Sequence, residues 1–489
     1  MRGAQQADRE KQIVVVGGGV AGLAAAHRVV ERSLESNRAV NVTVLEARDR
    51  LGGSLLSYRR GGYLVEGGPD SFITQKPAAL SLCRRVGLEN EVIGTNPDRR
   101  RVYVVRRGKL HPIPEGFLLL APTRIWPFLV SRLFSWPGKL RMGLDVVLPA
   151  RRRTPDEDES LADFVRRRFG REALARIAQP LVGGIYTADP EHLSLRATMP
   201  RFLELEDRYR SVILGMRKAA KRQGADRRGS GARYGMFVSL ADGMVTLVDV
   251  LAGRYLAGAT RTQAQVTRIT REGSRWRVTV ANGSDVTADA VILACPAYAS
   301  AKIVRALDPA LARSLASIEY ASSATMTMGF RRAQIRHPLD GFGFVVPAAE
   351  GRSLIAGTFG SIKFAGRAPA DHVLMRCFLG GAVQPHVYAM DDADLRQAVL
   401  ADLGELVGLQ GEPEFVDIHR WPNSMPQYPV GHVQHVARIE SAVRRHPALA
   451  VAGNAYGGVG IPDCVASGER AADRLLEEWL GPADGTRTV

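Results

Sequence analysis

The sequence predicts an α/β protein whose nucleotide-binding domain is assembled from separate stretches of the chain. A glycine-rich turn follows a valine-rich apolar run at 12–31, and a second glycine-rich loop lies near the end of the chain at 451–464. Glycines in such places let the backbone approach a ligand closely. The chain has 489 residues, too many for one hydrophobic core, so two or three domains are expected.

The first glycine turn has the spacing of a dinucleotide-binding fingerprint. Gly17, Gly19 and Gly22 fit the pattern G-x-G-x-x-G, between an apolar strand pattern and an alanine-rich helical pattern. Gly17 permits the tight turn, Gly19 lets the backbone approach a pyrophosphate, and Gly22 lets helix and strand pack closely. The second predicted strand ends at Glu46, an acid placed to bind a ribose hydroxyl. Both NAD and FAD fit these residues.

Further glycines distinguish the two cofactors. Arg50 and the pair Gly52 and Gly53 follow the acid, and another strand pattern leads into Gly68 and Pro69. This arrangement resembles the flavin amine oxidase superfamily, in which these stretches lie along the diphosphate and the flavin. Ser54 stands where amine oxidases often have arginine, which weakens a direct amine oxidase interpretation.

The late glycine loop resembles the C-terminal flavin motif of the same superfamily. A strand ends at Gly453, the loop runs from Asn454 to Gly460, and a helix begins near Ile461 and Asp463. The N–H groups at that helix N-terminus would point at the isoalloxazine or at the diphosphate. The resemblance therefore implies that both ends of the chain build one FAD site. Trp421, in the stretch before the motif, is also assigned to the cofactor.

The stretch between the two motifs completes the predicted architecture. Residues 260–299 predict a small meander of strands. By the resemblance, the strand that bears Val266 would meet the adenine through its backbone, and Ala294 would lie near the adenosine end. The expected fold is a discontinuous FAD-binding Rossmann-like (GR2-type) domain with two insertions. The FAD domain covers 10–85, 235–300 and 430–480, a mostly helical insertion covers 86–234, and an α+β substrate-binding domain covers 301–429.

The remaining segments resemble the oxygen-dependent protoporphyrinogen/coproporphyrinogen oxidase family of haem biosynthesis. The pieces "SWPGKLRMG", "GGIYTADP" and "RWPNSMPQYPVGH" are more specific than the nucleotide fingerprint. The resemblance implies six-electron oxidation of protoporphyrinogen IX or coproporphyrinogen III by FAD, with O2 as acceptor and H2O2 as product. The flavin accepts the hydride, so no catalytic acid or base is assigned. The alternatives are another amine or carotenoid oxidoreductase of the superfamily, or a non-catalytic relative of the GDP-dissociation inhibitor type.

The same resemblance implies a set of substrate-binding residues. Arg101, or Arg100 if the register shifts by one, would pair with a propionate, because arginine binds carboxylates in a planar bidentate manner. Gly184 would lie near the reacting methine or the flavin. Phe364 would stack on a pyrrole ring and Phe378 would line the site. A solvated charge at Arg101 and ordinary strand core at the two phenylalanines remain the alternatives.

The stretch 111–145 is dense in apolar side chains, interrupted by Arg124, Arg132, Lys139 and Arg141. One interpretation is an interfacial segment on an anionic lipid surface, and the other is a helical core that shields the substrate. The apolar side chains are Phe117, Leu118, Leu119, Leu120, Trp126, Phe128, Leu129, Leu133, Phe134 and Trp136.

The net charge of +16 favours acidic partners, but no nucleic-acid-binding motif accompanies it, so no nucleic acid partner is expected. The four cysteines form no C-x-x-C pair, which predicts no metal site and a reducing compartment. The N-terminus has no pattern of a signal peptide. We therefore expect a cytoplasmic protein, free or peripheral on the inner face of the cytoplasmic membrane. A homodimer and a hand-off to ferrochelatase are further expected contacts, and the basic run 217–233 predicts an exposed loop.

Overall fold

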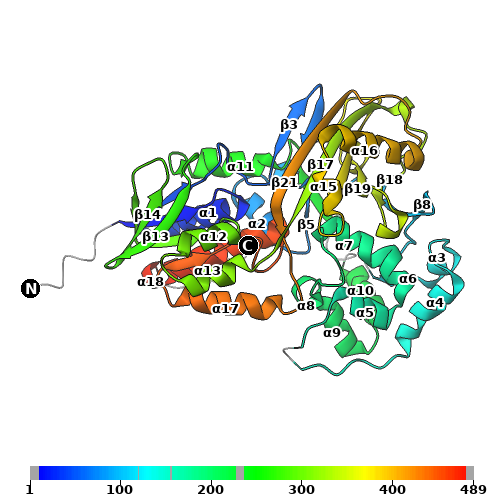
Figure 1. Cartoon of the computed structure of the whole chain (residues 1–489), viewed down its shortest axis with the longest axis horizontal. Coiled ribbons are helices and arrows are strands. Elements are labelled where there is room, and N and C mark those ends of the chain that lie inside the picture. The colour runs from blue at the N-terminus through cyan, green and yellow to red at the C-terminus, as the bar shows by residue number, and fades with distance from the viewer. Residues whose placement is uncertain (1–9, 119, 155–156, 227–235, 481–489) are drawn as a thin grey trace, which may run out of the picture.

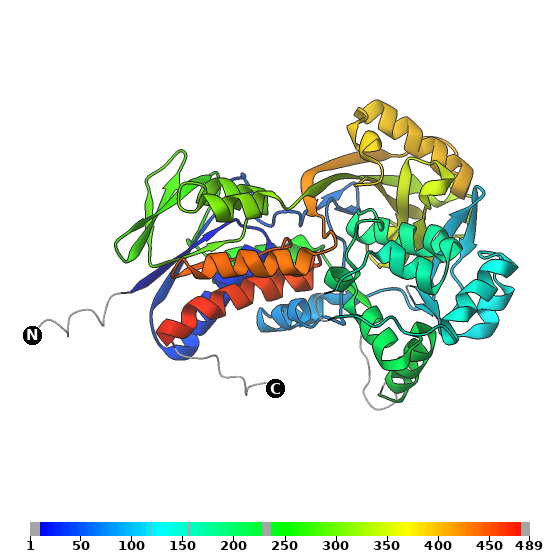
Figure 2. The ribbon, with the colours of Figure 1, turned by 60° about the horizontal axis from the view of Figure 1, so that its bottom comes forward.

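The computed structural model describes residues 10–118, 120–154, 157–226 and 236–480. Figure 1 shows three neighbouring parts: a sheet with helices and a strand meander at the left, a second sheet at the upper right, and a group of helices at the lower right. In Figure 2 the blue N-terminal and red C-terminal segments both lie in the left part. The predicted α/β class is confirmed, and segments far apart in the sequence build its first sheet.

Five parallel strands in the order β12-β2-β1-β16-β22 form that first sheet. They are β1 (Lys11–Val16), β2 (Val40–Leu45), β12 (Thr260–Arg261), β16 (Ala290–Leu293) and β22 (Leu449–Val451). Ile13, Val14 and Val15 in β1 are all fully buried, because both faces of the sheet are covered. This explains why the strand is a continuous apolar run in the sequence.

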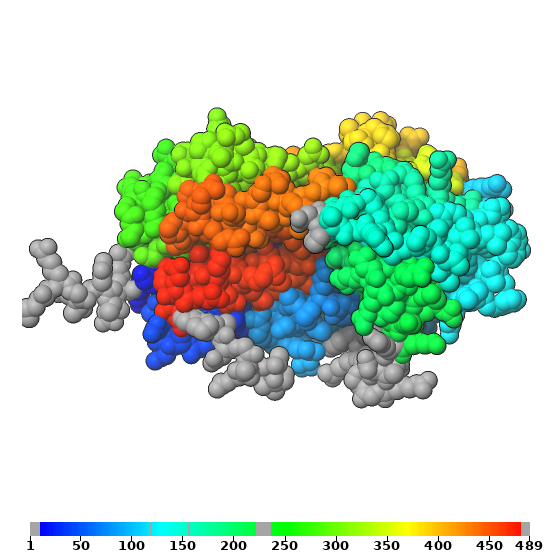
Figure 3. Space-filling view, turned by 90° about the horizontal axis from the view of Figure 1, so that it is seen from below, coloured from blue at the N-terminus to red at the C-terminus, as the bar shows by residue number. Residues whose placement is uncertain are grey.

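Helices from both ends of the chain cover one face of this sheet. A Cβ at Gly468 of α18 (Ile461–Leu480) would lie 2.1 Å from the carbonyl oxygen of Ala21 in α1 (Val20–Ser36). Glycine at this position therefore lets the two helix backbones touch. Figure 3 shows α18, in red, beside the blue N-terminal segment, and α18 contacts α2 there. The layer also includes α2 (Ala78–Arg85), α11 (Val245–Val250) and the π-helical turn η4 (Leu251–Tyr255).

The predicted meander covers the other face. It consists of β13 (Val266–Glu272), β14 (Arg275–Val280) and β15 (Val286–Ala288), which pair antiparallel. The helices α12 (Ala297–Val304), α13 (Pro309–Ala316) and α17 (His432–Arg444) share an apolar cluster with it. There are also two small antiparallel sheets. One pairs β3 (Ser57–Arg60) with β4 (Tyr63–Glu66). In the other, β11 (Phe237–Leu240) lies between β5 (Phe72–Ile73) and β6 (Val92–Gly94), and the 3-10 turn η1 (Glu89–Glu91) directly precedes β6.

The second large sheet has seven strands in the order β21-β17-β20-β19-β18-β7-β8. One face packs against α16 (Asp392–Val407), and the other faces the helical group. The strands are β7 (Arg101–Arg106), β8 (Lys109–Pro112), β17 (Tyr320–Arg331), β18 (Gly341–Val345), β19 (Leu354–Phe359), β20 (His372–Gly380) and β21 (Phe415–Pro426). Beside them lie α14 (Gly360–Lys363), α15 (Pro385–Ala389) and the 3-10 turns η5 (Arg332–Gln334) and η6 (Ala348–Glu350).

Two strands of this sheet differ from the predicted organisation. β7 and β8 come from the stretch 86–234, which the sequence assigned to a helical insertion, and they join the sheet because β7 pairs in parallel with β18. That pairing links residues far apart in the chain and has no local sequence signal. The boundaries of the three domains remain predictions.

The helical group contains most of the first insertion. Its elements are β9 (Phe117–Leu118), β10 (Ala121–Pro122), α3 (Ile125–Val130), α4 (Trp136–Gly143), the 3-10 turn η2 (Leu144–Val146), α5 (Leu161–Arg168), α6 (Arg171–Ala173), the π-helical turn η3 (Leu174–Ala178), α7 (Gln179–Tyr186), α8 (Leu195–Thr198), α9 (Pro200–Tyr209) and α10 (Val212–Asp226). Residues 217–226 of the basic run continue α10, so the predicted loop is wrong there, since Ala, Lys and Arg are good helix formers. Residues 227–233 lie outside the described part of the chain, as does Leu119. Among the described helices, none is both long and apolar enough to span a bilayer.

Candidate active site

The first glycine turn connects β1 to α1 at the carboxyl end of the parallel sheet. Gly17 has a φ of +108°, and a Cβ there would lie 2.9 Å from the backbone of Ala294. A Cβ at Gly22 would lie only 1.9 Å from the carbonyl oxygen of Gly17. Ala294 is fixed in place because its N–H donates to the carbonyl oxygen of Val16 at 2.8 Å. The tight turn and the close helix–strand contact predicted for Gly17 and Gly22 are thus present.

Other glycines of the predicted site expose bare backbone. A Cβ at Gly453 would meet no atom within 4 Å, and one at Gly19 would meet only the Cα of Gly53, at 4.0 Å. Gly19 bridges to Gly52, so the two early glycine stretches lie side by side. α1 begins directly after Gly19, and the first N–H groups of a helix lack partners within it. Bare backbone beside a helix N-terminus is suited to a diphosphate.

Glu46 follows β2 and reaches back to the glycine turn. Its carboxylate accepts the N–H of Gly18 at 2.6 Å and the N–H of Arg48 at 2.9 Å. Its carbonyl oxygen accepts the N–H of Ala264 at 2.8 Å, which brings the start of β13, with the buried Val266, next to the acid. The structure therefore gathers the residues assigned to the adenosine end, while their contacts with the cofactor remain a prediction.

The Arg50 guanidinium shapes the second glycine stretch. It donates to the carbonyl oxygens of Gly53 at 2.6 Å, Leu55 at 3.0 Å and Leu51 at 3.2 Å. Gly52 and Gly53 both have positive φ, at +92° and +59°, in the turn that Arg50 encloses. Arg50 thus fixes the backbone that would approach the cofactor.

A stacked pair of aromatic side chains holds the late glycine loop. The rings of Tyr428 and His432 lie 4.0 Å apart and 12° from parallel. The Tyr428 hydroxyl donates to the carbonyl oxygen of Asn454 and accepts the N–H of Gly458 at 2.9 Å. Burial lowers the pKa of His432 to about 4, so the neutral ring donates from Nε2 to the carbonyl oxygen of Ala455 at 3.0 Å. Sequence reasoning missed both side chains, although they lie in the stretch "RWPNSMPQYPVGH".

The loop leads into α18, which begins at Ile461 as predicted. Asp463, in the first turn of the helix, accepts the N–H of Gly460 at 3.3 Å. Both of its carboxylate oxygens accept from Nζ of Lys76, at 2.7 Å and 2.8 Å. Lys76, which sequence reasoning did not single out, therefore ties the early flavin stretch to the C-terminal helix.

The segment with Gly68 and Pro69 lies between the two large sheets. A Cβ at Gly68 would lie 1.7 Å from the carbonyl oxygen of Ser54, so only glycine fits. The indole Nε1 of Trp421, on β21, donates to the carbonyl oxygen of Gly67 at 3.0 Å. Trp421 thus contacts the loop that the sequence assigned to the flavin.

Arg101 does not lie with the other predicted substrate residues. Its side chain is 66% exposed and pairs with Asp340 at 2.5 Å. Tyr103 shares its face of β7 and also donates to Asp340. That face packs toward α16, whereas Phe378 lies on the opposite face, toward the helical group. The structure therefore places Arg101 and Phe378 on opposite faces of the sheet, and the binding of a propionate by Arg101 or Arg100 remains a prediction.

Phe364 is the residue expected to stack on a pyrrole ring. Its side chain is 1% exposed, at the end of α14, between the ammonium of Lys363 at 5.0 Å and the guanidinium of Arg367 at 5.6 Å from its ring centroid. Phe364 follows α14 and does not lie on a strand, so it is not the strand core of the alternative interpretation, and stacking on a pyrrole remains a prediction.

Phe378 and Gly184 lie where the seven-stranded sheet meets α7. Phe378 is half-buried on β20. A Cβ at Gly184 would lie 3.9 Å from side chains of Ala356 and Val345, so α7 packs closely on the same face of the sheet. These two residues remain candidates for contact with a substrate.

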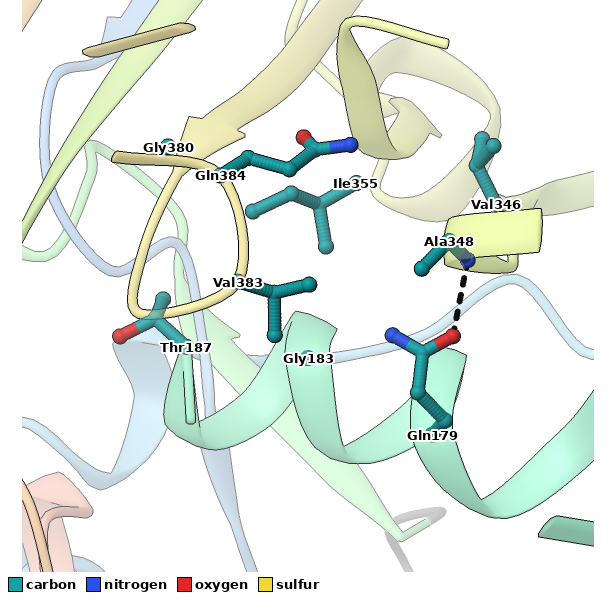
Figure 4. A pocket seen from close by; sticks show the side chains of 9 residues that line it. All are labelled: Gln179, Gly183, Thr187, Val346, Ala348, Ile355, Gly380, Val383 and Gln384. Atoms are coloured by element: carbon teal, nitrogen blue, oxygen red, sulfur yellow. Dashed lines mark hydrogen bonds between the residues drawn. The ribbon is translucent and has the colours of Figure 1, made fainter. Parts of the chain in front are cut away.

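A small cavity lies beside them, between α7 and the sheet (Figure 4). Val346, Ile355 and Val383 line it, and Gln179 accepts the N–H of Ala348 at 2.8 Å at its edge. Its volume is about 10 Å³, enough for one water molecule. A tetrapyrrole is far larger, so this cavity is not its binding site.

The sequence of this chain is similar to those of known proteins. The sequence pattern of the family described as flavin containing amine oxidoreductase matches residues 20–476. The chain belongs to this family. It is 37% identical to the coproporphyrinogen III oxidase of Propionibacterium freudenreichii subsp. freudenreichii, over 96% of this chain and 91% of that protein. It is 34% identical to the coproporphyrinogen III oxidase of Bacillus subtilis (strain 168), over 96% of this chain and 98% of that protein. It is 30% identical to the chloroplastic protoporphyrinogen oxidase of Oryza sativa subsp. japonica, over 95% of this chain and 88% of that protein.

Solved structures agree with this family membership. A crystal structure from Exiguobacterium sp. 255-15 superposes with a TM-score of 0.83 at 32% identity, over 96% of this chain and 99% of that one. Cyclohexylamine oxidase from Brevibacterium oxydans IH-35A gives a TM-score of 0.69 at 16% identity, over 96% and 99%, and shows the shared fold alone. The chain is an FAD-dependent oxidoreductase of this family, and its glycine turns, acid and two helix N-termini fit that cofactor. The alternative of a non-catalytic relative is set aside.

Proposed function

We propose that the chain oxidises a porphyrinogen of haem biosynthesis, with coproporphyrinogen III as the substrate. The observation that supports this most is identity over nearly the full length to proteins named coproporphyrinogen III oxidase, at 37% and 34%. The protoporphyrinogen oxidase of rice is 30% identical, which makes protoporphyrinogen IX the second candidate.

The reaction would remove six hydrogens from the macrocycle in three two-electron steps, with three O2 reduced to three H2O2. FAD, when bound, supplies the hydride acceptor. The chain would bind and orient: the open backbone at Gly19 and Gly453 leaves room for the cofactor, Arg50 holds the turn of Gly52 and Gly53, and Tyr428 holds the late loop. Phe378 offers an apolar face to a flat substrate. A homodimer and a hand-off to ferrochelatase remain predictions.

Turnover with the two porphyrinogens tests the substrate. The FAD-loaded protein is offered each in air at matched concentrations, and porphyrin fluorescence is followed. We expect kcat/KM for coproporphyrinogen III to exceed that for protoporphyrinogen IX by about tenfold or more, which is about 1.4 kcal/mol of discrimination. A preference for protoporphyrinogen IX would overturn the choice of substrate, and no porphyrin from either would overturn the function.

We further propose that one end of the molecule rests on an anionic lipid surface. The structure divides the apolar stretch 111–145 into two groups. Phe117, Phe128 and Phe134 pack together in a core, with ring centroids 5.5–6.3 Å apart. Trp126, Trp136 and Leu140 are instead 74%, 64% and 72% exposed on α3 and α4.

The position and the charge of this surface support the proposal. α3 and α4 lie at the end of the molecule farthest from the parallel sheet (Figures 1 and 2). Arg124 and Arg132 are exposed beside them. Lys139 and Arg141, also expected to face lipid, instead donate to backbone carbonyl oxygens, Lys139 to that of Leu129 at 2.6 Å. Exposed tryptophans with flanking cations are typical of segments that bind at the membrane interface.

Vesicle binding tests this surface. The double variant Trp126→Ser with Leu140→Ser should lose most binding to phosphatidylcholine vesicles that contain phosphatidylglycerol, because it removes two apolar side chains from the contact. Leu34→Ser, at a 76% exposed residue of α1, is the matched control and should bind as the unchanged protein does. Equal binding by all three proteins, or by none, would contradict the proposal.

A further inference from the structure

The loop 67–71 contains Gly68 and Pro69, which are assigned to the flavin, and it is held by side chains of the seven-stranded sheet. The hydroxyl of Thr325, on β17, donates to the carbonyl oxygen of Gly67 at 2.8 Å, and the same oxygen accepts from Trp421 on β21 at 3.0 Å. Lys363, in α14, donates to both carboxylate oxygens of Asp70 at 3.0 Å. The seven-stranded sheet therefore sets the position of a loop that belongs to the FAD-binding part of the chain.

Arg376 lies between these contacts, on β20. It is 6% exposed, and its Nη2 donates to the carbonyl oxygen of Gly68. Its guanidinium carbon lies 4.8 Å from the ring centroid of Phe378, two residues along the same strand and on the same face. Its Nε is buried and, within the described residues, has no hydrogen-bond partner, and neither has the hydroxyl of Thr327, which pairs with Arg376 across the strands. A buried polar atom without a partner in the chain calls for an explanation, and a bound group beside it is one.

The charges around the loop add up to a positive excess. Lys363, Arg367 and Arg376 contribute three cations, and Asp70 and Glu66 are the nearby acids. Burial raises the pKa of Glu66 to about 7, so this carboxyl is only partly ionised at neutral pH. Lys363 and Arg376 outweigh the effect of burial on Asp70 and hold its pKa far below the usual range, so Asp70 stays ionised. A buried excess of cations favours an electron-rich neighbour, and a flavin becomes more negative when it is reduced.

We propose that Arg376 is a positioning residue that fixes the loop 67–71 against the flavin and places positive charge beside it. Its contact with Phe378 joins this loop to the face of the sheet where a flat substrate would lie. The inference rests on FAD binding by the family, and it does not depend on which porphyrinogen is oxidised.

Two substitutions separate the geometry from the charge. Arg376→Met removes both, and should weaken FAD binding by about tenfold or more, because a charge-assisted hydrogen bond is lost. It should also lower the reduction potential of the bound flavin and shift its visible absorption bands. Arg376→Lys keeps the positive charge but lacks the planar guanidinium. The reduction potential of its bound flavin should therefore return towards that of the unchanged protein, while FAD binding stays several-fold weaker.

Arg420→Met is the matched control. Arg420 lies on β21, donates to the carbonyl oxygens of Tyr388 and Met390, and packs 5.6 Å from the Tyr388 ring centroid. Arg420 lies on the face of the seven-stranded sheet opposite to that of Arg376. Its removal should therefore change neither the dissociation constant of FAD nor the reduction potential of the flavin. If Arg376→Met fails to fold, the FAD affinity of Arg376→Lys, compared with that of Arg420→Met, tests the proposal alone. An Arg376 variant whose FAD affinity and potential match those of Arg420→Met would overturn the proposal. Loss of turnover with unchanged flavin parameters would count against it in the same way, whatever the substrate.

Discussion

Replacing Gly22 with alanine is expected to abolish stable FAD binding. The added Cβ would lie 1.9 Å from the carbonyl oxygen of Gly17 and 3.3 Å from the Cβ of Ala294. The first of these is a backbone atom of the glycine turn, so α1 must move away from β1 to relieve the contact. The N-terminus of α1, which is assigned to the diphosphate, then shifts, and overpacking of this kind costs about 1–3 kcal/mol or more. The ratio of flavin to protein after purification, together with Tm, measures both effects.

The control for this substitution is Gly253→Ala. Gly253 lies in η4 of the same part of the molecule, and a Cβ there would meet no atom within 4 Å. This variant should keep its flavin and its Tm. A Gly22→Ala protein that retains a full complement of FAD would show that the turn is not built as the structure places it.

Asp145→Ala should destabilise the helical group by about 3–5 kcal/mol, because it removes the nearer counter-ion of a buried guanidinium and leaves only Glu206, at 3.4 Å. Asp145 is 0% exposed and Arg168 is 1% exposed. Arg168 Nε donates to Asp145 at 2.6 Å, and the other carboxylate oxygen accepts from the Ser211 hydroxyl at 2.6 Å and from the N–H of Ile213 at 2.9 Å. The carboxylate thus joins η2, α5 and the start of α10. Urea or thermal unfolding followed by circular dichroism gives the change in the free energy of unfolding.

An exposed acid of α5, the helix that contains Arg168, provides the comparison. Asp163 pairs with Arg166 at 3.1 Å, but its side chain is 67% exposed. Asp163→Ala should therefore cost less than about 1 kcal/mol. The two variants losing equal stability would contradict the role given to the buried network. Replacing Asp145 and Arg168 together by apolar residues should recover part of the loss.

Local patterns in the sequence predicted the glycine turn and the acid that are assigned to the cofactor. Gly17, Gly22 and Glu46 lie within one strand–turn–helix–strand unit, so short-range spacing is enough to place them. The late loop was found because a glycine run beside an apolar strand is itself unusual. Tyr428 and His432 were missed, because a stacked pair that holds a loop has no distinctive sequence pattern.

The faces on which the proposed substrate residues lie could not be predicted from the sequence, for a physical reason. The face of a strand on which a side chain lies depends on register, and the register of β7 is set by β18, which lies more than two hundred residues later. Arg101 accordingly pairs with Asp340, and Phe364 is buried between Lys363 and Arg367. Arg376 lies in the stretch "MRCFLGGA" that drew attention for Phe378, but only the folded chain shows that it reaches Gly68.

Anaerobic mixing of the FAD-loaded protein with coproporphyrinogen III tests the central claim most directly. Without oxygen, the substrate should bleach the visible absorbance of the bound flavin, and readmitting air should restore it as porphyrin and H2O2 form in a ratio of one to three. If the flavin is bleached by dithionite but not by coproporphyrinogen III or protoporphyrinogen IX, the site holds a competent flavin whose substrate is not a porphyrinogen, and the proposed function is wrong.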